Sequence, residues 1–402
     1  MIRRDTFLPF TRPMLGEEEI AELIDSIHSG WITTGPKAAK FEEALAAYNG
    51  APHVLAMNSA TTAQEITMQV LGLQPGDEVI TTSLTWVSTL STVVLQGGVP
   101  VLVDIDPKTL NIDPAKLEAA ITPRTKGIIP VHLTGLPVDM DAVWAVAKKH
   151  HLWVVEDAAQ AMGARYKGKK IGSDARTAMT VYSFHPNKNM TTGEGGAIAF
   201  HDPHRLGRIQ RLRFHGIERD AWKRQSKEGS VHIDVEEPAR KANFMDLQAA
   251  MGLHQIKKLD GFNSKRGQLF HRYLDLMKDM DEVMLPHAGD ADLGHCFHLF
   301  VARILPEKAG LGRDEFVTEL KERNIGTGIH YKPAHQHSYY RAFYEKRLHA
   351  LPKDGLPHTD WSGDRLCSLP LWPGLTEEDQ DLVVAVMKDV FVTARARSRV
   401  TV

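Results

Sequence analysis

The sequence predicts an α/β protein with a large domain, built on a mainly parallel sheet of seven strands, and a smaller α+β domain after it. Three observations predict this. Short β-branched or apolar runs alternate with helix-compatible segments from about residue 50 to 200, which is typical of a parallel sheet covered on both faces. One long helical pattern and then mixed strands and helices follow. At 402 residues the chain is also too long for one small core.

The seven expected strands are short and rich in apolar residues. They span residues 53–57, 78–82, 100–104, 127–131, 152–156, 179–182 and 197–200. Helix-compatible patterns lie between several of them, at residues 62–73, 85–96, 113–121 and 139–150. This alternation brings the carboxyl ends of the strands to one edge of the sheet, where α/β folds bind their ligands.

An extended helical pattern from Met245 to Lys278 follows, with Gly252 and Gly261 as the candidate points of interruption, and we expect it to bridge two domains. We place the large domain at residues 14–250 and the small one at 251–402, with residues 1–13 as an arm packed on the small domain or on a second subunit. Within the small domain we expect strands at residues 283–285 and 295–302 and helices at 313–322 and 377–395. We expect the arginines at 395, 397 and 399 to lie in a frayed, solvated end.

Composition disfavours several kinds of partner. A formal net charge of -2 gives no field that favours nucleic acid or an anionic membrane. No apolar run approaches the length of a membrane span, and the first residues lack a secretory signal. Cys296 and Cys367 form no CxxC pair, and no histidine spacing indicates a metal site. We therefore expect a cytoplasmic protein without metal, membrane span or nucleic-acid partner.

Lys188 is the most informative candidate residue, because it lies between an expected strand and the glycine turn Gly195-Gly196. This position puts the lysine at the ligand-binding edge of the sheet. A lysine that is partly desolvated there can act as a neutral amine nucleophile toward an aldehyde cofactor. A single loop lysine is more often a solvated charge, so the assignment depends on the rest of a cofactor site.

Three further groups follow strands at the same edge. Asp157 can keep a pyridine nitrogen protonated, although such an aspartate is about as often a helix N-cap, and we interpret Glu156 as structural. Residues 57–62 offer backbone amides to a phosphate, or only cap a helix. Trp86 can offer a flat face to an aromatic ring, although tryptophan is more often core. Together with the lysine, these groups indicate pyridoxal phosphate as the cofactor.

Four segments carry a resemblance to a known family: FLPF at 7–10, GWITTGPK at 30–37, SLTWVST at 83–89 and CSLPL at 367–371. Nearly the whole chain resembles the DegT-type sugar-nucleotide aminotransferases, which are fold-type I pyridoxal-phosphate enzymes. Within that family it is most similar to the UDP-4-amino-4-deoxy-L-arabinose oxoglutarate aminotransferases. The resemblance implies ping-pong transfer of an amino group from L-glutamate, released as 2-oxoglutarate, to the ketone of a nucleotide-linked sugar.

The resemblance also implies roles for individual residues. Lys188 is implied to form the covalent imine with the cofactor, and the other implied cofactor contacts are Ser59, Ala60, Trp86, Asp157, Gln160 and Ser183. Asn243 is implied to reach the phosphate from a partner subunit, which makes the active form a homodimer with shared sites. The implied substrate contacts are Trp31, His330 and Lys332.

Some positions depart from the family pattern, and they leave the acceptor open. Residues 186–187, 191–194 and 236–242 differ from the arabinose branch, and Lys332 stands where arginine is expected. A cyclitol or small non-sugar ketone is therefore an alternative acceptor. Relatives that remove a sugar hydroxyl carry histidine in place of Lys188, and a regulatory binder without turnover would not need that lysine. A dinucleotide-binding dehydrogenase should carry GxGxxG where residues 58–62 read NSATT.

Overall fold

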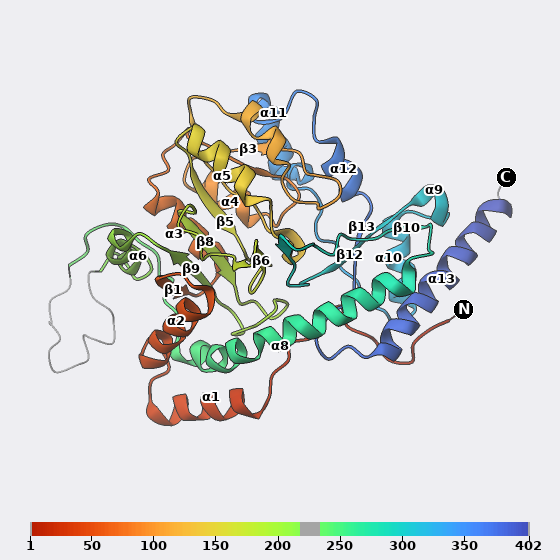
Figure 1. Cartoon of the computed structure of the whole chain (residues 1–402), viewed down its shortest axis with the longest axis horizontal. Coiled ribbons are helices and arrows are strands. Elements are labelled where there is room, and N and C mark those ends of the chain that lie inside the picture. Colours follow the sequence, from red (N-terminus) through yellow and green to blue (C-terminus); the bar gives the residue numbers. More distant parts are fainter. Residues whose placement is uncertain (1, 218–233, 401–402) are drawn as a thin grey trace.

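A computed structural model describes residues 2–217 and 234–400 of the chain (Figure 1). It confirms the seven-stranded sheet, whose strand order is β1-β9-β8-β5-β4-β2-β3. The strands are β1 (His53–Met57), β2 (Glu78–Thr82), β3 (Val99–Val103), β4 (Thr125–Ile128), β5 (Trp153–Asp157), β8 (Met179–Ser183) and β9 (Gly196–Phe200). Only β9 runs antiparallel to its neighbours, so the sheet is mainly parallel.

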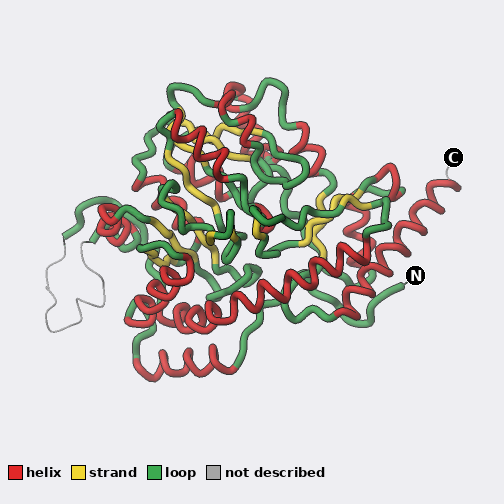
Figure 2. Tube along the Cα trace, in the orientation of Figure 1, coloured by secondary structure: helices red, strands yellow, loops and turns green. Residues whose placement is uncertain are grey.

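Helices lie outside the large sheet (Figure 2). They include α2 (Pro36–Asn49), α3 (Ala60–Val70), α4 (Ser88–Leu95), α5 (Met140–Lys149) and α6 (Leu206–Leu212). Strands β2, β8 and β9 are buried along their whole length, as expected for a sheet covered on both faces. The sequence patterns did not predict α2 or α1 (Glu17–Ser29), which precede the sheet.

The helix expected at residues 113–121 is wrong, because this segment forms two short 3-10 turns, Pro114–Lys116 and Glu118–Ala120. A hydrogen bond between a nearby side chain and the backbone forms at each end of the segment. The Asp113 side chain accepts from the Ala115 amide, and the Thr125 hydroxyl accepts from the Thr122 amide. These side-chain bonds offer the backbone an alternative to a continuous helix.

Helix α8 (Asp246–Met277) runs without interruption between two hydrophobic cores, and its 32 residues make it the bridge that the sequence predicts. The helix breaks at neither of the two candidate points, Gly252 and Gly261. Gly252 serves packing instead: a Cβ there would lie 2.6 Å from the ring of Phe41. A small residue lets α8 approach α2 closely.

The second core is built on a three-stranded antiparallel sheet, β10 (Val283–Met284), β12 (Phe300–Ile304) and β13 (Leu366–Leu369). Its helices are α9 (Pro306–Ala309), α10 (Arg313–Glu322) and α13 (Glu377–Val400), while α11 (Ser338–Glu345) and α12 (Pro357–Gly363) follow the loop at residue 331. A third small sheet joins β6 (Arg165–Tyr166), β7 (Lys169–Lys170) and β11 (Leu293–Gly294). Leu8 of the N-terminal arm belongs to the second core.

Two expectations for this region are wrong. The strand expected at 295–302 begins only at Phe300, because Phe297 has a φ of 56° and so lies outside the extended region. The C-terminal segment is helical up to Val400 rather than frayed. Arg395 pairs there with Glu282, and Arg397 Nη1 lies 2.9 Å from Glu319 Oε1.

The domain boundary at residue 250 falls inside α8 and stays a prediction. Residues of α8 contribute to both cores, since Leu259 packs in the first and Phe270 in the second. Within residues 2–217 and 234–400, none of the helices has the length and apolar character of a membrane span.

Candidate active site

Lys188 lies in a loop between β8 and β9 that is closed by its own hydrogen bonds. The Phe184 amide donates to the Gly195 carbonyl at 2.9 Å, and the Thr192 amide donates to the Phe184 carbonyl at 3.0 Å. Asn189, directly after the lysine, donates from its side chain to Asn263 Oδ1 of α8 at 2.6 Å. The loop is therefore fixed to the bridging helix. The order of strand, lysine, glycine turn and strand that the sequence predicts is confirmed.

The amine of Lys188 is in a desolvated environment. The side chain is partly buried, and burial lowers its pKa to about 8, while the negative charge of Asp157 acts in the opposite direction. An amine with this pKa has a substantial neutral fraction near physiological pH. Nucleophilic attack on an aldehyde requires that neutral form.

Asp157 is the last residue of β5 and is only 4% exposed. Its Oδ2 accepts from Gln64 Nε2 at 2.6 Å and from the Thr89 hydroxyl at 2.8 Å. Its Oδ1 accepts from the Ala159 amide at 3.2 Å. The carboxylate is thus buried, hydrogen-bonded and close enough to affect the charge of Lys188.

Gln160 connects the large sheet to the loop that carries Tyr331. Its Oε1 accepts from the Thr134 amide at 2.7 Å, and its Nε2 donates to the Tyr331 hydroxyl at 2.7 Å. The Tyr331 ring lies 5.6 Å from that of Trp86, and burial raises the pKa of the tyrosine. Trp86 itself is 57% exposed, so its ring is available to a ligand.

Ser59, Ala60 and Ser183 come together where α3 meets β9. Ser59 caps α3 by accepting from the Thr62 amide at 3.1 Å, and Ser183 pairs with Gly196 across β8 and β9. A Cβ on Gly196 would lie 2.3 Å from the amide nitrogen of Ala60, so only glycine allows this approach. The first amides of a helix have no intrahelical acceptor, which makes this junction suited to a phosphate.

His330 lies close enough to Lys188 for the charge of the lysine to affect it. Its Nδ1 is 2.8 Å from the Ser368 hydroxyl, and its ring stacks on Phe10 of the N-terminal arm with centroids 5.1 Å apart. Burial, together with the charge of Lys188, lowers the pKa of His330 to about 4. At neutral pH it is therefore an uncharged hydrogen-bonding group.

Three predicted residues are not brought to the lysine by any contact in the described part of the chain. Trp31 packs beside Gly35, and Lys332 is exposed. Asn243 lies beside Met57 at the end of β1, accepts from the Lys241 ammonium and donates to the Thr34 hydroxyl at 2.7 Å. Their roles stay predictions.

The model of the DegT/DnrJ/EryC1/StrS aminotransferase family matches residues 13–388. The chain belongs to this aminotransferase family. It is 42% identical to the spore coat polysaccharide biosynthesis protein SpsC of Bacillus subtilis (strain 168) over 389 residues, 96% of this chain and 98% of SpsC. The closer likeness to the arabinose branch stays a prediction.

Solved structures, among them a putative sugar aminotransferase, have the same fold as this family member. The putative sugar aminotransferase Spr1654 of Streptococcus pneumoniae, in its PLP form, is 30% identical with a TM-score of 0.87, over 96% of this chain and 99% of that chain. DesV of S. venezuelae is 31% identical with a TM-score of 0.85, over 96% and 99% of the two chains. The fold and the aminotransferase class predicted from the sequence are confirmed.

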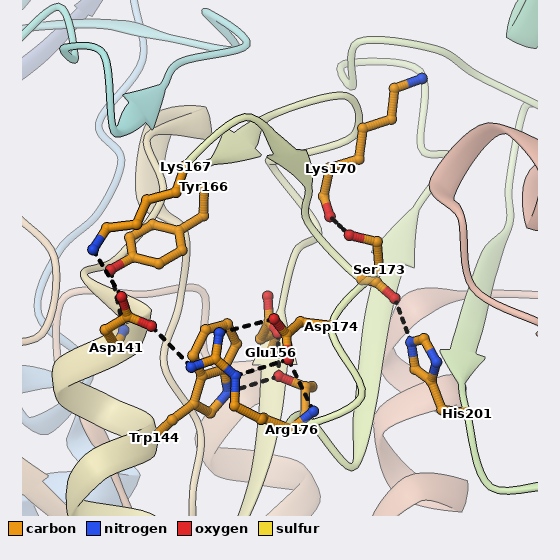
Figure 3. Close-up of polar contacts among 12 residues, drawn as sticks. Asp141, Trp144, Glu156, Tyr166, Lys167, Lys170, Ser173, Asp174, Arg176 and His201 are labelled. Carbon is orange, nitrogen blue, oxygen red and sulfur yellow. Dashed lines mark hydrogen bonds and ion pairs between the residues drawn. The ribbon is translucent and has the colours of Figure 1, made fainter.

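Glu156 of this aminotransferase has the structural surroundings that the sequence suggested. It precedes Asp157 in β5, so the two side chains point to opposite faces of the sheet. Its Oε2 lies 2.9 Å from His132 Nε2, and Oε1 accepts from the Thr177 hydroxyl. Figure 3 shows Glu156 beside Trp144 and Arg176. These three residues are among those that line a cavity of about 220 Å³.

Four of the charged residues around this cavity, Asp141, Lys167, Asp174 and Arg176, are paired with one another. Arg176 bonds to Asp174 and Asp141, and Lys167 bonds to Asp141 (Figure 3). The Arg176 guanidinium also lies 3.7 Å from the centre of the Trp144 ring. These interactions join α5 to the segment before β8, and a catalytic role for Asp157, on the opposite face of β5 from Glu156, stays a prediction.

Sequence reasoning missed three residues at this site. Gln64 and Thr89 bond to Asp157, and Tyr331 bonds to Gln160. The sequence does contain one indication for Gln64: a large polar side chain lies between Ala63 and Ile66, which are apolar and buried in the expected helix.

Proposed function

We propose that this protein is a pyridoxal-phosphate-dependent aminotransferase that moves the amino group of L-glutamate to the ketone of a nucleotide-linked keto sugar. The observation that carries the proposal is the position of Lys188: partly buried, with its pKa lowered, and within electrostatic reach of Asp157. The similarity to SpsC and to sugar aminotransferases of known structure supports a sugar as the acceptor.

The residues present fit pyridoxal phosphate. The cradle of Ser59, Ala60 and Ser183, which the glycine at 196 keeps open, suits the phosphate. Asp157 suits the pyridine nitrogen and Trp86 the ring face. When bound, this cofactor supplies an electron sink for the carbanion formed at the amino acid.

The side chains supply positioning and proton transfer. Lys188 would hold the cofactor through its amine, and the same amine would carry the proton at the substrate α carbon. Gln160 and Tyr331 bound the site on one side, and His330 offers an uncharged donor or acceptor to the substrate. In the second half of the cycle the same groups act on the keto sugar in reverse.

We also propose a homodimer, and helix α1 supports it. The residues that α1 buries are polar, Glu19 and Ser26, whereas Ile20, Ile24 and Ile27 are 48%, 48% and 61% exposed. Positions i, i+4 and i+7 form one stripe on a helix. Figure 1 shows α1 at the outer edge of the molecule, so a second copy can cover this stripe.

The test is Lys188→Ala with L-glutamate and a panel of ketones: nucleotide-linked keto sugars, a cyclitol ketone and small non-sugar ketones. The wild type should release 2-oxoglutarate with a keto-sugar nucleotide and yield its amino sugar by mass. Lys188→Ala should bind the cofactor but turn over slower by about 10²–10⁴-fold. Lys169 is an exposed lysine of β7, and Lys169→Ala is the control that should keep the wild-type rate. Near-normal turnover of Lys188→Ala would refute the assignment, and product only from cyclitols would select the alternative acceptor.

A further inference from the structure

Gln64 reaches Asp157 from inside helix α3. It lies in the second turn of the helix that begins at the phosphate cradle, and it is 2% exposed. Its Nε2 donates to Asp157 Oδ2 at 2.6 Å, across 93 positions of sequence. A hydrogen bond of this length to a carboxylate belongs to the strong, charge-assisted class.

The other end of the Gln64 amide has no such partner. Its Oε1 is buried and makes no hydrogen bond with any residue of the described ranges. A buried acceptor without a donor opposes folding, and an apolar side chain of similar shape would fill the same volume without that cost. The benefit of glutamine at this position is therefore its one contact, to Asp157.

The bonds around Asp157 differ between its two oxygens. Oδ2 accepts from both Gln64 and Thr89, and each carboxylate oxygen has about two acceptor positions. Among the residues that the structure describes, Oδ1 accepts only from the Ala159 amide at 3.2 Å, so it keeps one position open. A protonated pyridine nitrogen is a donor that needs such a position.

We propose that Gln64 is a positioning residue for the reaction: with Thr89 it holds Oδ2 and directs Oδ1 of Asp157 to the pyridine nitrogen. This rests on the proposed function, which gives Asp157 its cofactor role. Gln64 acts through Asp157 and does not touch the reacting atoms.

The test is Gln64→Met, which keeps the length of the side chain and removes the donor. We expect the Kd for pyridoxal phosphate to rise on the order of tenfold. With cofactor labelled by ¹⁵N in its ring, the nitrogen signal should move toward the unprotonated position at a given pH. The unfolding midpoint of the apo protein should change little, because the variant loses one bond and one unsatisfied acceptor together.

Thr67→Val is the matched control. Thr67 lies in the same helix, is fully buried, and its hydroxyl has no partner among the described residues. This variant should leave the Kd and the nitrogen signal unchanged. A similar change in both variants would mean that Gln64 acts through helix packing, and would overturn the proposal.

A double-mutant cycle with Asp157→Asn separates the two levels of the argument. If Gln64 acts through Asp157, Gln64→Met should have no further effect on the nitrogen signal in the Asp157→Asn background. If Asp157→Asn moves that signal and Gln64→Met alone does not, the role of Gln64 is overturned and the proposed function stands. If Asp157→Asn leaves the signal unmoved, the cofactor role of Asp157 is refuted and the role of Gln64 with it.

Discussion

Lys188 is a titrating group whose pKa can be measured in the apo protein. Burial lowers this pKa to about 8 and Asp157 raises it, so the amine should become neutral as the pH rises through that value. We therefore expect the rate of pyridoxal phosphate capture, followed by absorbance, to rise with a midpoint near that pH. Asp157→Asn removes the charge that favours the ammonium, so its midpoint should be lower. A midpoint near 10.5, the ordinary pKa of a lysine, would contradict this expectation.

The same shift has a consequence for stability. The folded pKa of about 8 lies below the unfolded value of 10.5, so the unfolded chain binds more protons between them and stability rises with pH across that window. Lys188→Met removes the buried amine, and should raise the urea midpoint of the apo protein at pH about 7. The gain over wild type should shrink as the pH approaches the unfolded value. Lys169→Met should show no such trend, and a gain independent of pH would point to packing instead.

Residues that follow strands could be predicted from sequence, and residues that depend on distant contacts could not. Lys188 and Asp157 follow recognisable strands, and parallel strands end at a common edge. Gln64 lies within a helix, and its partner is 93 positions away, so its role is visible only after folding. Asn243 was expected to act on a partner subunit, which no pattern within one chain can establish.

At the scale of elements, the contact between β9 and the start of α3 shapes the proposed phosphate cradle. Gly196→Ala would place a Cβ 2.3 Å from the Ala60 amide nitrogen. The backbone of α3 cannot move aside as a flexible side chain can. We expect a loss of about 1–3 kcal/mol in unfolding free energy, measured by urea denaturation. The affinity for pyridoxal phosphate should fall as well, because α3 must move away from β9.

Gly261→Ala in α8 provides the matched control for that substitution. Gly261 is exposed, helical and without any atom within 4 Å of an added Cβ. Alanine there should stabilise the protein by about 0.5–1 kcal/mol and leave cofactor affinity unchanged. If Gly196→Ala behaves like Gly261→Ala, the close approach of β9 and α3 is not a constraint on the site.

Element prediction failed where local side-chain bonds or aromatic packing override periodicity. Residues 295–302 alternate like a strand, yet Phe297 turns to pack on Phe270, with ring centroids 5.1 Å apart, and takes a positive φ. Gly252 and Gly261 resemble helix breaks, yet α8 continues through both because tertiary packing outweighs their weak propensity.

At the scale of the whole molecule, one loop joins the second core to the active site. His335 of this loop donates its amide to the Ser83 hydroxyl at 3.0 Å, and its ring nitrogen Nε2 lies 3.0 Å from Asp360 Oδ1. Ser83 follows β2, so the loop is fixed at the strand edge that carries the site. Tyr331, four residues earlier, is thereby held against Gln160.

The apolar stripe on α1 predicts the oligomeric state. Wild type should sediment at twice the 44.8 kDa of one chain. Ile24→Lys places a charge in the middle of the stripe and should shift the protein to monomers at micromolar concentration. Val392→Lys, which replaces a more exposed apolar residue of α13, should leave the mass unchanged. A dimer that persists in Ile24→Lys would exclude α1 as the interface.

Mixing two inactive variants tests whether the sites are shared between subunits. If Asn243 serves the partner's phosphate cradle, a hybrid of Lys188→Ala and Asn243→Ala subunits has one site with both defects and one site with neither. Random exchange makes half of the dimers hybrid, so about a quarter of the sites should regain activity. If Asn243 instead serves its own chain, where it lies beside Met57, every site in the hybrid keeps one defect. Activity no greater than the sum of the two variants would then place Asn243 in its own subunit's site.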